Sequence, residues 1–193
     1  KVSVEVCGAP YVIRDGYFYV FCRETPSGGV RKRSYLSVVR ARVSEVVKAG
    51  LDGKKSEWKK YYLGAFSEMA NGGKSSSLGF GNTGIRWMDV TYNTSIKKYI
   101  MVVAANSSRG KVDLFLSFSD DCMKWEGRRR ITYEDGECFY PSIVGFGGNE
   151  RETGRKFYIY YTFSSHGDWG RWNDAVIARR KVIIPGDEQS KQD

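Results

Sequence analysis

The chain has 193 residues, of which 41% are hydrophobic, 15% aromatic and 27% charged, and its formal net charge at pH 7 is +9. Aromatic and apolar residues are spread along the whole chain, which excludes a mainly disordered protein, and the length is that of one ordinary globular domain. A membrane-spanning helix is excluded as well, because apolar runs such as Tyr99–Ala105 fall far short of the ~20 residues that a bilayer requires.

Short β-branched and aromatic runs, separated by Gly, Asp, Asn and Ser, predict strands through most of the chain. The stretch Tyr11–Arg14, Asp15-Gly16, Tyr17–Cys22 predicts a hairpin, because Asp-Gly suits the positive φ angles of a tight turn. Helical periodicity is confined to Ser44–Gly50, where about one turn of helix ending at Gly50 is expected.

The same order of strands recurs three times, which predicts three units at residues 1–66, 67–133 and 134–185, followed by a polar, disordered tail at 186–193. Each unit starts with a strand that has Pro or Asp near its beginning, at 9–13, 88–92 and 140–144. An aromatic-aliphatic strand comes next, at 17–22, 98–104 and 156–161, and a more polar one follows, at 35–43, 113–119 and 174–184. Trp58 and Trp125 close the first two units, each before a candidate outer strand.

Four antiparallel strands repeated every ~50–65 residues are typical of β-propeller blades. The expected fold is therefore all-β, with about three propeller blades. The alternative is a β-sandwich in which the similarity between hairpins is coincidental.

Three segments resemble the five-bladed β-propeller glycoside hydrolases of the family 43-like and sialidase-like superfamily. GAPYVIRDGYFYVF (Gly8–Phe21) looks like an inner-strand hairpin of that group, and YPSIVGFGGNERETGRKFYIYYT (Tyr140–Thr162) is similar to a later blade. LFLSFSDDCMKWE (Leu114–Glu126) resembles a sialidase Asp-box that lacks its Gly and is one residue shorter. The resemblance implies that this chain supplies the C-terminal blades, and that a second chain or a processed segment supplies the missing ones.

Glycoside hydrolysis requires two carboxylates across a sugar, which the resembled enzymes carry at the starts of inner strands. On that pattern the catalytic candidates are Asp89 and Glu137, with Glu5 behind them, while Gly8 and Tyr140 stand where further acids would be expected. The bland readings are a strand-start Asp that bonds backbone amides and a solvated loop Glu. Neighbouring substrate-binding candidates lie beside these positions: Arg86, which could orient Asp89 or grip a carboxylate, Trp87 and Tyr140.

The loop SSHGDWGRWND (Ser164–Asp174) is the other candidate site. His166 could act as an acid, a base or a ligand, or simply as a hydrogen-bonding loop residue. Trp169 and Trp172 offer flat faces for sugar CH groups, although packing over a sheet rim explains them equally well.

Four cysteines, Cys7, Cys22, Cys122 and Cys138, permit two disulfides, and the local pairs Cys7–Cys22 and Cys122–Cys138 are expected. Without a C-x-x-C pair and with a single His, a zinc site is disfavoured. No cofactor is expected, and a structural calcium is left open, since carboxylates and carbonyls suffice for it.

A secreted or extracellular location is expected from the cysteines and from two glycosylation sequons, which begin at Asn93 and Asn106. Lys1 opens the chain without Met and no signal peptide is visible, so we expect a mature, processed or partial chain.

Three functions follow, in descending order. The first is a glycosidase-like propeller that acts on or binds polysaccharide. The second is a non-catalytic propeller that binds an acidic glycan or a protein partner, which the charge of +9 favours. The third is nucleic-acid binding through basic patches, which is ranked last because no recognised module is present.

Overall fold

The computed structural model describes residues 2–5, 8, 10–26, 34–79, 84–146, 151–166 and 173–185. Over these residues the chain is mostly β, with three sheets and one short helix, so the all-β class is confirmed at that level. Among the described residues, no helix has the length and apolar character of a membrane-spanning segment.

The first sheet has the strand order β1-β3-β4-β5-β6, and β2 pairs with the same strand β3 that pairs with β1. The helix α1 (Val43–Leu51) follows β4 directly. The strands are β1 (Val2–Glu5), β2 (Tyr11–Arg14), β3 (Tyr17–Pro26), β4 (Tyr35–Arg42), β5 (Lys59–Tyr62) and β6 (Ala65–Met69).

The second sheet has the order β10-β9-β8-β7-β12, in which β12 is parallel to β7, and the third has the order β11-β13-β14. The second sheet contains β7 (Ile85–Asn93), β8 (Lys98–Asn106), β9 (Val112–Ser119), β10 (Glu126–Arg130) and β12 (Glu152–Thr153). The third contains β11 (Glu137–Gly145), β13 (Lys156–Ser164) and β14 (Val176–Ile183).

Local sequence accounts for the turns that join these strands. Asp15 and Gly16 have φ angles of 50° and 76°, as a tight turn between β2 and β3 requires, and the predicted hairpin is confirmed. The predicted helix is confirmed too, with Glu45 in its first turn and Lys48 in its last, where each charge complements the helix dipole.

The sheets differ in strand number from the expected four-stranded units. β3 is long enough to pair with β2 through Tyr17–Val20 and with β1 through Arg23–Pro26, so one edge of the first sheet is shared by two short strands. The second sheet gains β12 from a segment that follows β11 in the chain. The arrangement has three sheets rather than the two layers of a sandwich.

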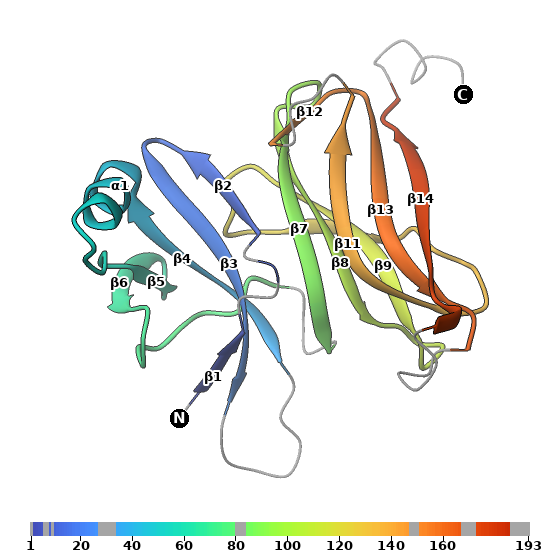
Figure 1. The fold of residues 1–193 in the computed structure, drawn as a ribbon, viewed down its shortest axis with the longest axis horizontal. Coiled ribbons are helices and arrows are strands. Elements are labelled where there is room, and N and C mark those ends of the chain that lie inside the picture. The colour runs from blue at the N-terminus through green and yellow to red at the C-terminus, as the bar shows by residue number, and fades with distance from the viewer. Residues whose placement is uncertain are drawn as a thin grey trace.

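The three sheets stand side by side in chain order, with the second in the middle (Figure 1). Strand β8 lies between two hydrophobic cores and supplies alternate side chains to each, as the two-residue period of a strand requires. Met101, Val103 and Ala105 pack toward the first sheet, and Ile100, Val102 and Ala104 toward the third. All six are completely buried, so the middle sheet joins the three sheets into one packed unit.

The face of the first sheet that points away from the second holds a buried ion pair. Lys60 and Glu24 are both 0% exposed, and the Lys60 ammonium lies 3.3 Å from a Glu24 carboxylate oxygen. The Ser37 and Ser75 hydroxyls also donate to this carboxylate, at 2.6 and 2.9 Å. Because every polar partner is satisfied, the pair fixes the segment around Ser75 against the sheet without an unpaired charge.

The predicted disulfide between Cys122 and Cys138 is wrong. Cys122 lies in the core between the first two sheets and Cys138 in the core on the other side of the middle sheet. Burial raises the pKa of both thiols to about 12, so neither is a reactive thiolate at neutral pH. No disulfide links Cys22 to another described cysteine, and Cys7 lies outside the described residues.

Asn93 ties the segment after β11 to the middle sheet. Its Nδ2 donates to Thr153 Oγ1 at 3.0 Å and to the Gly154 carbonyl at 2.7 Å. Its Oδ1 accepts the backbone N–H groups of Ser95 and Ile96, both at 3.1 Å. The side chain is 0% exposed, so this sequon has no room for a glycan in the folded protein, whereas Asn106 is exposed.

We expect Asn93→Asp to lower the free energy of unfolding by about 2–4 kcal/mol, because both amide donors are lost and a carboxylate oxygen faces the Gly154 carbonyl. Urea unfolding of this variant and of Asn106→Asp measures the effect. Asn106 accepts from Arg86 at an exposed position, so its carboxylate variant keeps that role and serves as the control. Equal midpoints for both variants would contradict this role of Asn93.

Candidate functional site

A cavity of about 620 Å³ opens between β7 and β11, beside the segment that leads into β2. Its size falls within the range of small-molecule sites in proteins. The described residues that line it are Gly8, Pro10, Trp87, Met88, Asp89, Tyr140, Pro141, Ser142, Ile143, Val144 and Arg151. All three sheets therefore contribute to it or border it, and Asp89, Trp87 and Tyr140, which were predicted separately, lie in one place.

Asp89 on β7 reaches across to β11. One carboxylate oxygen accepts the backbone N–H of Ile143 at 2.7 Å and the Ser142 hydroxyl at 3.4 Å, and the other accepts the backbone N–H of Val90 at 2.8 Å. Burial raises the pKa of Asp89 above its ordinary value, and these hydrogen bonds and the nearby Arg151 guanidinium oppose the shift only in part. Asp89 is thus both a tie between two sheets and an acidic group at the cavity wall.

Trp87 and Tyr140 form an aromatic pair at the cavity, with ring centroids 4.5 Å apart. Trp87 is held from behind by Phe139, at 5.5 Å in an edge-to-face contact. Tyr140 is 48% exposed and has a φ of 49°, inside a strand whose pairing shifts between Phe139 and Ser142. A non-glycine residue in this region costs of order 1–3 kcal/mol, and such strain is concentrated at functional sites.

Arg151 connects this cavity to a neighbouring one of about 510 Å³ along β2. Its guanidinium lies over the Tyr11 ring, 4.0 Å from the centroid. The second cavity is lined with further tyrosines, Tyr11, Tyr92 and Tyr99, and Arg151 lines both. An extended ligand could therefore follow β7 from Trp87 toward Tyr92 without leaving a lined surface.

The structure does not bring Glu137 to Asp89. Glu137 begins β11, six residues before Ile143, which places it roughly 15–20 Å along the strand from the amide that Asp89 binds. A glycosidase pair lies ~5–9.5 Å apart. Glu137 instead accepts the backbone N–H of Val112 at 3.2 Å, so its carboxylate ties β11 to β9 and the expected pair does not form.

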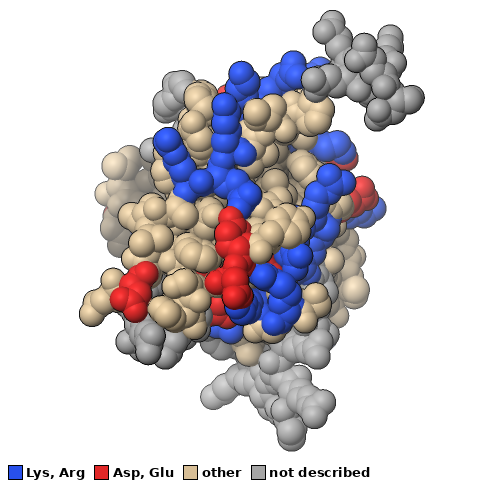
Figure 2. All heavy atoms as spheres, turned by 90° about the vertical axis from the view of Figure 1, so that its right-hand side faces the viewer, with Lys and Arg blue, Asp and Glu red and all other residues tan. Residues whose placement is uncertain are grey.

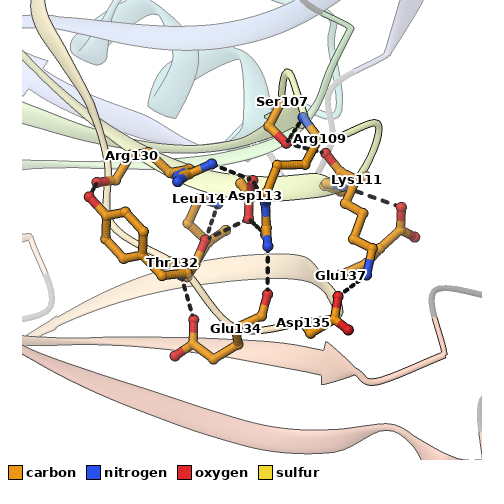
Figure 3. A network of polar contacts seen from close by, with 12 residues as sticks. Ser107, Arg109, Lys111, Asp113, Leu114, Arg130, Thr132, Glu134, Asp135 and Glu137 are labelled. Atoms are coloured by element: carbon orange, nitrogen blue, oxygen red, sulfur yellow. Dashed lines mark hydrogen bonds and ion pairs between the residues drawn. The ribbon is translucent and has the colours of Figure 1, made fainter.

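Glu137 lies in a network that closes this end of the two sheets (Figure 3). Asp113, whose side chain is 1% exposed, is its centre: Arg109 donates to both carboxylate oxygens, at 2.6 and 3.3 Å, and Thr132 donates at 3.3 Å. Lys111 pairs with Asp135 at the rim. These contacts connect β9 with the segment that leads into β11 and are structural.

The remaining predicted residues lie elsewhere. Arg86 donates to Asn106 Oδ1 at 3.3 Å, and neither it nor His166, an exposed residue after β13, lines the cavity. The backbone of Glu5 pairs with Arg23 in the first sheet. Trp169 and Trp172 lie outside the described residues.

Ser142 and Arg151 are cavity residues that sequence reasoning missed. Ser142 follows Tyr140-Pro141 and was considered only as part of a strand, although it sits where the strand pairing shifts. Arg151 had no signal of its own, because it reaches the cavity only through the contact of its segment with β7. No group of three or more metal-ligating side chains occurs in the described ranges.

The raised pKa of Asp89 predicts a pH dependence of stability. Below the ordinary pKa of Asp the carboxyl is protonated in both states, and the favourable contribution is fully present; it is lost as the pH rises through the raised pKa of the folded state. We therefore expect the stability of the wild type relative to Asp89→Asn to fall as the pH rises. Urea unfolding from about pH 3 to pH 8 tests this, and parallel curves would contradict it.

In comparisons with known proteins, no family model matches the chain, and neither a curated protein nor a solved structure matches it significantly.

Proposed function

We propose that this chain is a saccharide-binding protein, and that the cavity between β7 and β11 holds a sugar ring. One observation carries the proposal. An exposed, backbone-strained Tyr140 lies against Trp87 at 4.5 Å, next to the Asp89 carboxyl and the Ser142 hydroxyl. Sugars present CH faces that stack on aromatic rings and hydroxyl groups that hydrogen-bond to carboxylates and hydroxyls.

Binding fits the geometry better than hydrolysis by this chain alone. Asp89 is the one carboxylate among the described residues that line the cavity, and two of its hydrogen bonds are already made with backbone amides. A general acid needs a second carboxylate across the sugar. Hydrolysis is therefore the second candidate, favoured by the raised pKa of Asp89 and dependent on a carboxylate from another segment or chain.

We also propose that the three sheets are neighbouring blades of an incomplete propeller. The chain-order stacking supports this, as does the placement of both cavities along β7, next to β2 and β11. The resemblance to five-bladed enzymes implies that further blades come from another segment or chain. Native mass spectrometry of the purified protein is expected to find a second polypeptide in a fixed ratio, and a folded monomer would rule this out.

An acidic saccharide is the favoured ligand class. The net charge is +9, and Arg151 lines both cavities. Lys and Arg also outnumber Asp and Glu on the side of the molecule that carries β14 (Figure 2). Binding to such a ligand should weaken as salt screens the charges. Secretion accords with this ligand class and stays a prediction, as does the preference over nucleic acid.

We expect Tyr140→Gly to abolish binding to oligosaccharides at little cost in stability. Glycine relieves the positive φ, which offsets the lost contact with Trp87, so the free energy of unfolding should change by less than about 1 kcal/mol. Calorimetry with a panel of neutral and uronic-acid oligosaccharides measures the affinity. Tyr133→Ala is the control, since Tyr133 is 65% exposed and does not line either cavity.

If Tyr140→Gly and Tyr133→Ala bind the panel as the wild type does, the site is misplaced. Reducing-sugar release by the wild type and by Asp89→Asn then separates the two candidate functions. Release that Asp89→Asn eliminates would support hydrolysis, and binding without release supports the non-catalytic role.

A further inference from the structure

A separate cavity of about 670 Å³ lies between the β9–β10 end of the second sheet and the end of β14. We propose that it binds an apolar organic anion, that is, an aliphatic or aromatic molecule with one carboxylate, sulfate or phosphate group. The proposal concerns neither the residues of the saccharide site nor its ligand, because the two cavities share no lining residue.

The floor of this cavity is apolar. Side chains that pack on the edge of the core between the second and third sheets leave part of their surface toward the cavity: Ile96, Leu116, Phe118, Ile131, Val182 and Ile184. Leu116 is nearly buried, at 6% exposure, whereas the others are partly buried. A concave apolar surface of this size gains free energy when an apolar group displaces its water.

The charges at the rim are sorted by their partners. Lys98 is paired with Asp120 at 2.8 Å. The Asp121 carboxylate accepts the backbone N–H groups of Met123 and Lys124, both at 2.8 Å. These three rim charges are therefore already satisfied.

The Lys124 ammonium, the Arg129 guanidinium and the Glu126 carboxylate remain, and in the described part of the chain none of these side chains has a hydrogen-bond or ion-pair partner. Lys124 and Arg129 are both exposed. The rim therefore keeps a net positive charge of one beside an apolar floor. That combination complements an anion with an apolar body, since the head group can pair with the cations while the body covers the floor.

Gly127 keeps this wall of the cavity open. Its φ is 65°, and a Cβ there would meet the Phe118 ring at 3.4 Å. Glycine is the residue that adopts this conformation at least cost, and it leaves the Phe118 face accessible to a ligand.

The probe 1-anilinonaphthalene-8-sulfonate, an aromatic anion, tests the proposal by its fluorescence on binding. We expect saturable binding of one probe per chain, weakened at least tenfold in Lys124→Glu/Arg129→Glu. The control Lys48→Glu/Lys55→Glu makes the same change in net charge at exposed positions on and after α1 and should bind as the wild type does. Ile96→Glu, in the turn between β7 and β8, should weaken binding without the loss of a rim cation.

Non-saturable fluorescence, or equal weakening in both double variants, would overturn the proposal, because either result means that net charge or general surface adsorption accounts for the signal. Loss of probe binding in Tyr140→Gly with no loss in Lys124→Glu/Arg129→Glu would place the probe in the saccharide site and overturn it as well. Failure of oligosaccharides to bind leaves this test unaffected.

Discussion

The burial of the middle sheet on both faces is the constraint on which the rest of the structure depends. Seven consecutive residues of β8, from Tyr99 to Ala105, are buried, and they alternate between two cores. Each large side chain buried in this way contributes about 1.5–3 kcal/mol. A strand that packs on both sides holds the first and third sheets at fixed separations, and the edges of those sheets then meet along β7.

The candidate site is a consequence of that packing. Asp89 extends from β7 to the Ile143 amide on β11, and Trp87 on the same strand meets Tyr140. The cavity therefore exists only while the second and third sheets stay in register. The contacts of Asn93 and Asp113 hold the same two sheets near their ends, so residues outside the cavity determine its shape.

Local signals in the sequence predicted the elements well. Asp15-Gly16 specifies its turn by backbone preference alone, and Ser44–Gly50 lies within α1. The apolar run Tyr99–Ala105 was read only as too short for a membrane, although an unbroken run of this length is also typical of a strand buried on both faces. Asp89, Trp87 and Tyr140 were singled out correctly as neighbours because the strand starts that carry them recur in the repeat.

What the sequence could not supply was long-range register. Glu137 precedes Tyr140 by only three residues, yet the strand carries it to the opposite end of β11 from Asp89. Cys122 and Cys138 are close in sequence, but the middle sheet lies between their side chains. Arg151 reaches the cavity through the pairing of its segment with β7. Such pairings are decided by the tertiary packing of the sheets rather than by local preference.

The most direct test of the central claim is a crystal structure of the chain, with any polypeptide that completes it, soaked with the oligosaccharide that binds most tightly. The account predicts a sugar ring stacked on Tyr140, with a hydroxyl within hydrogen-bonding distance of Asp89 or Ser142. A ring bound elsewhere, with the cavity between β7 and β11 filled only by water, would contradict it.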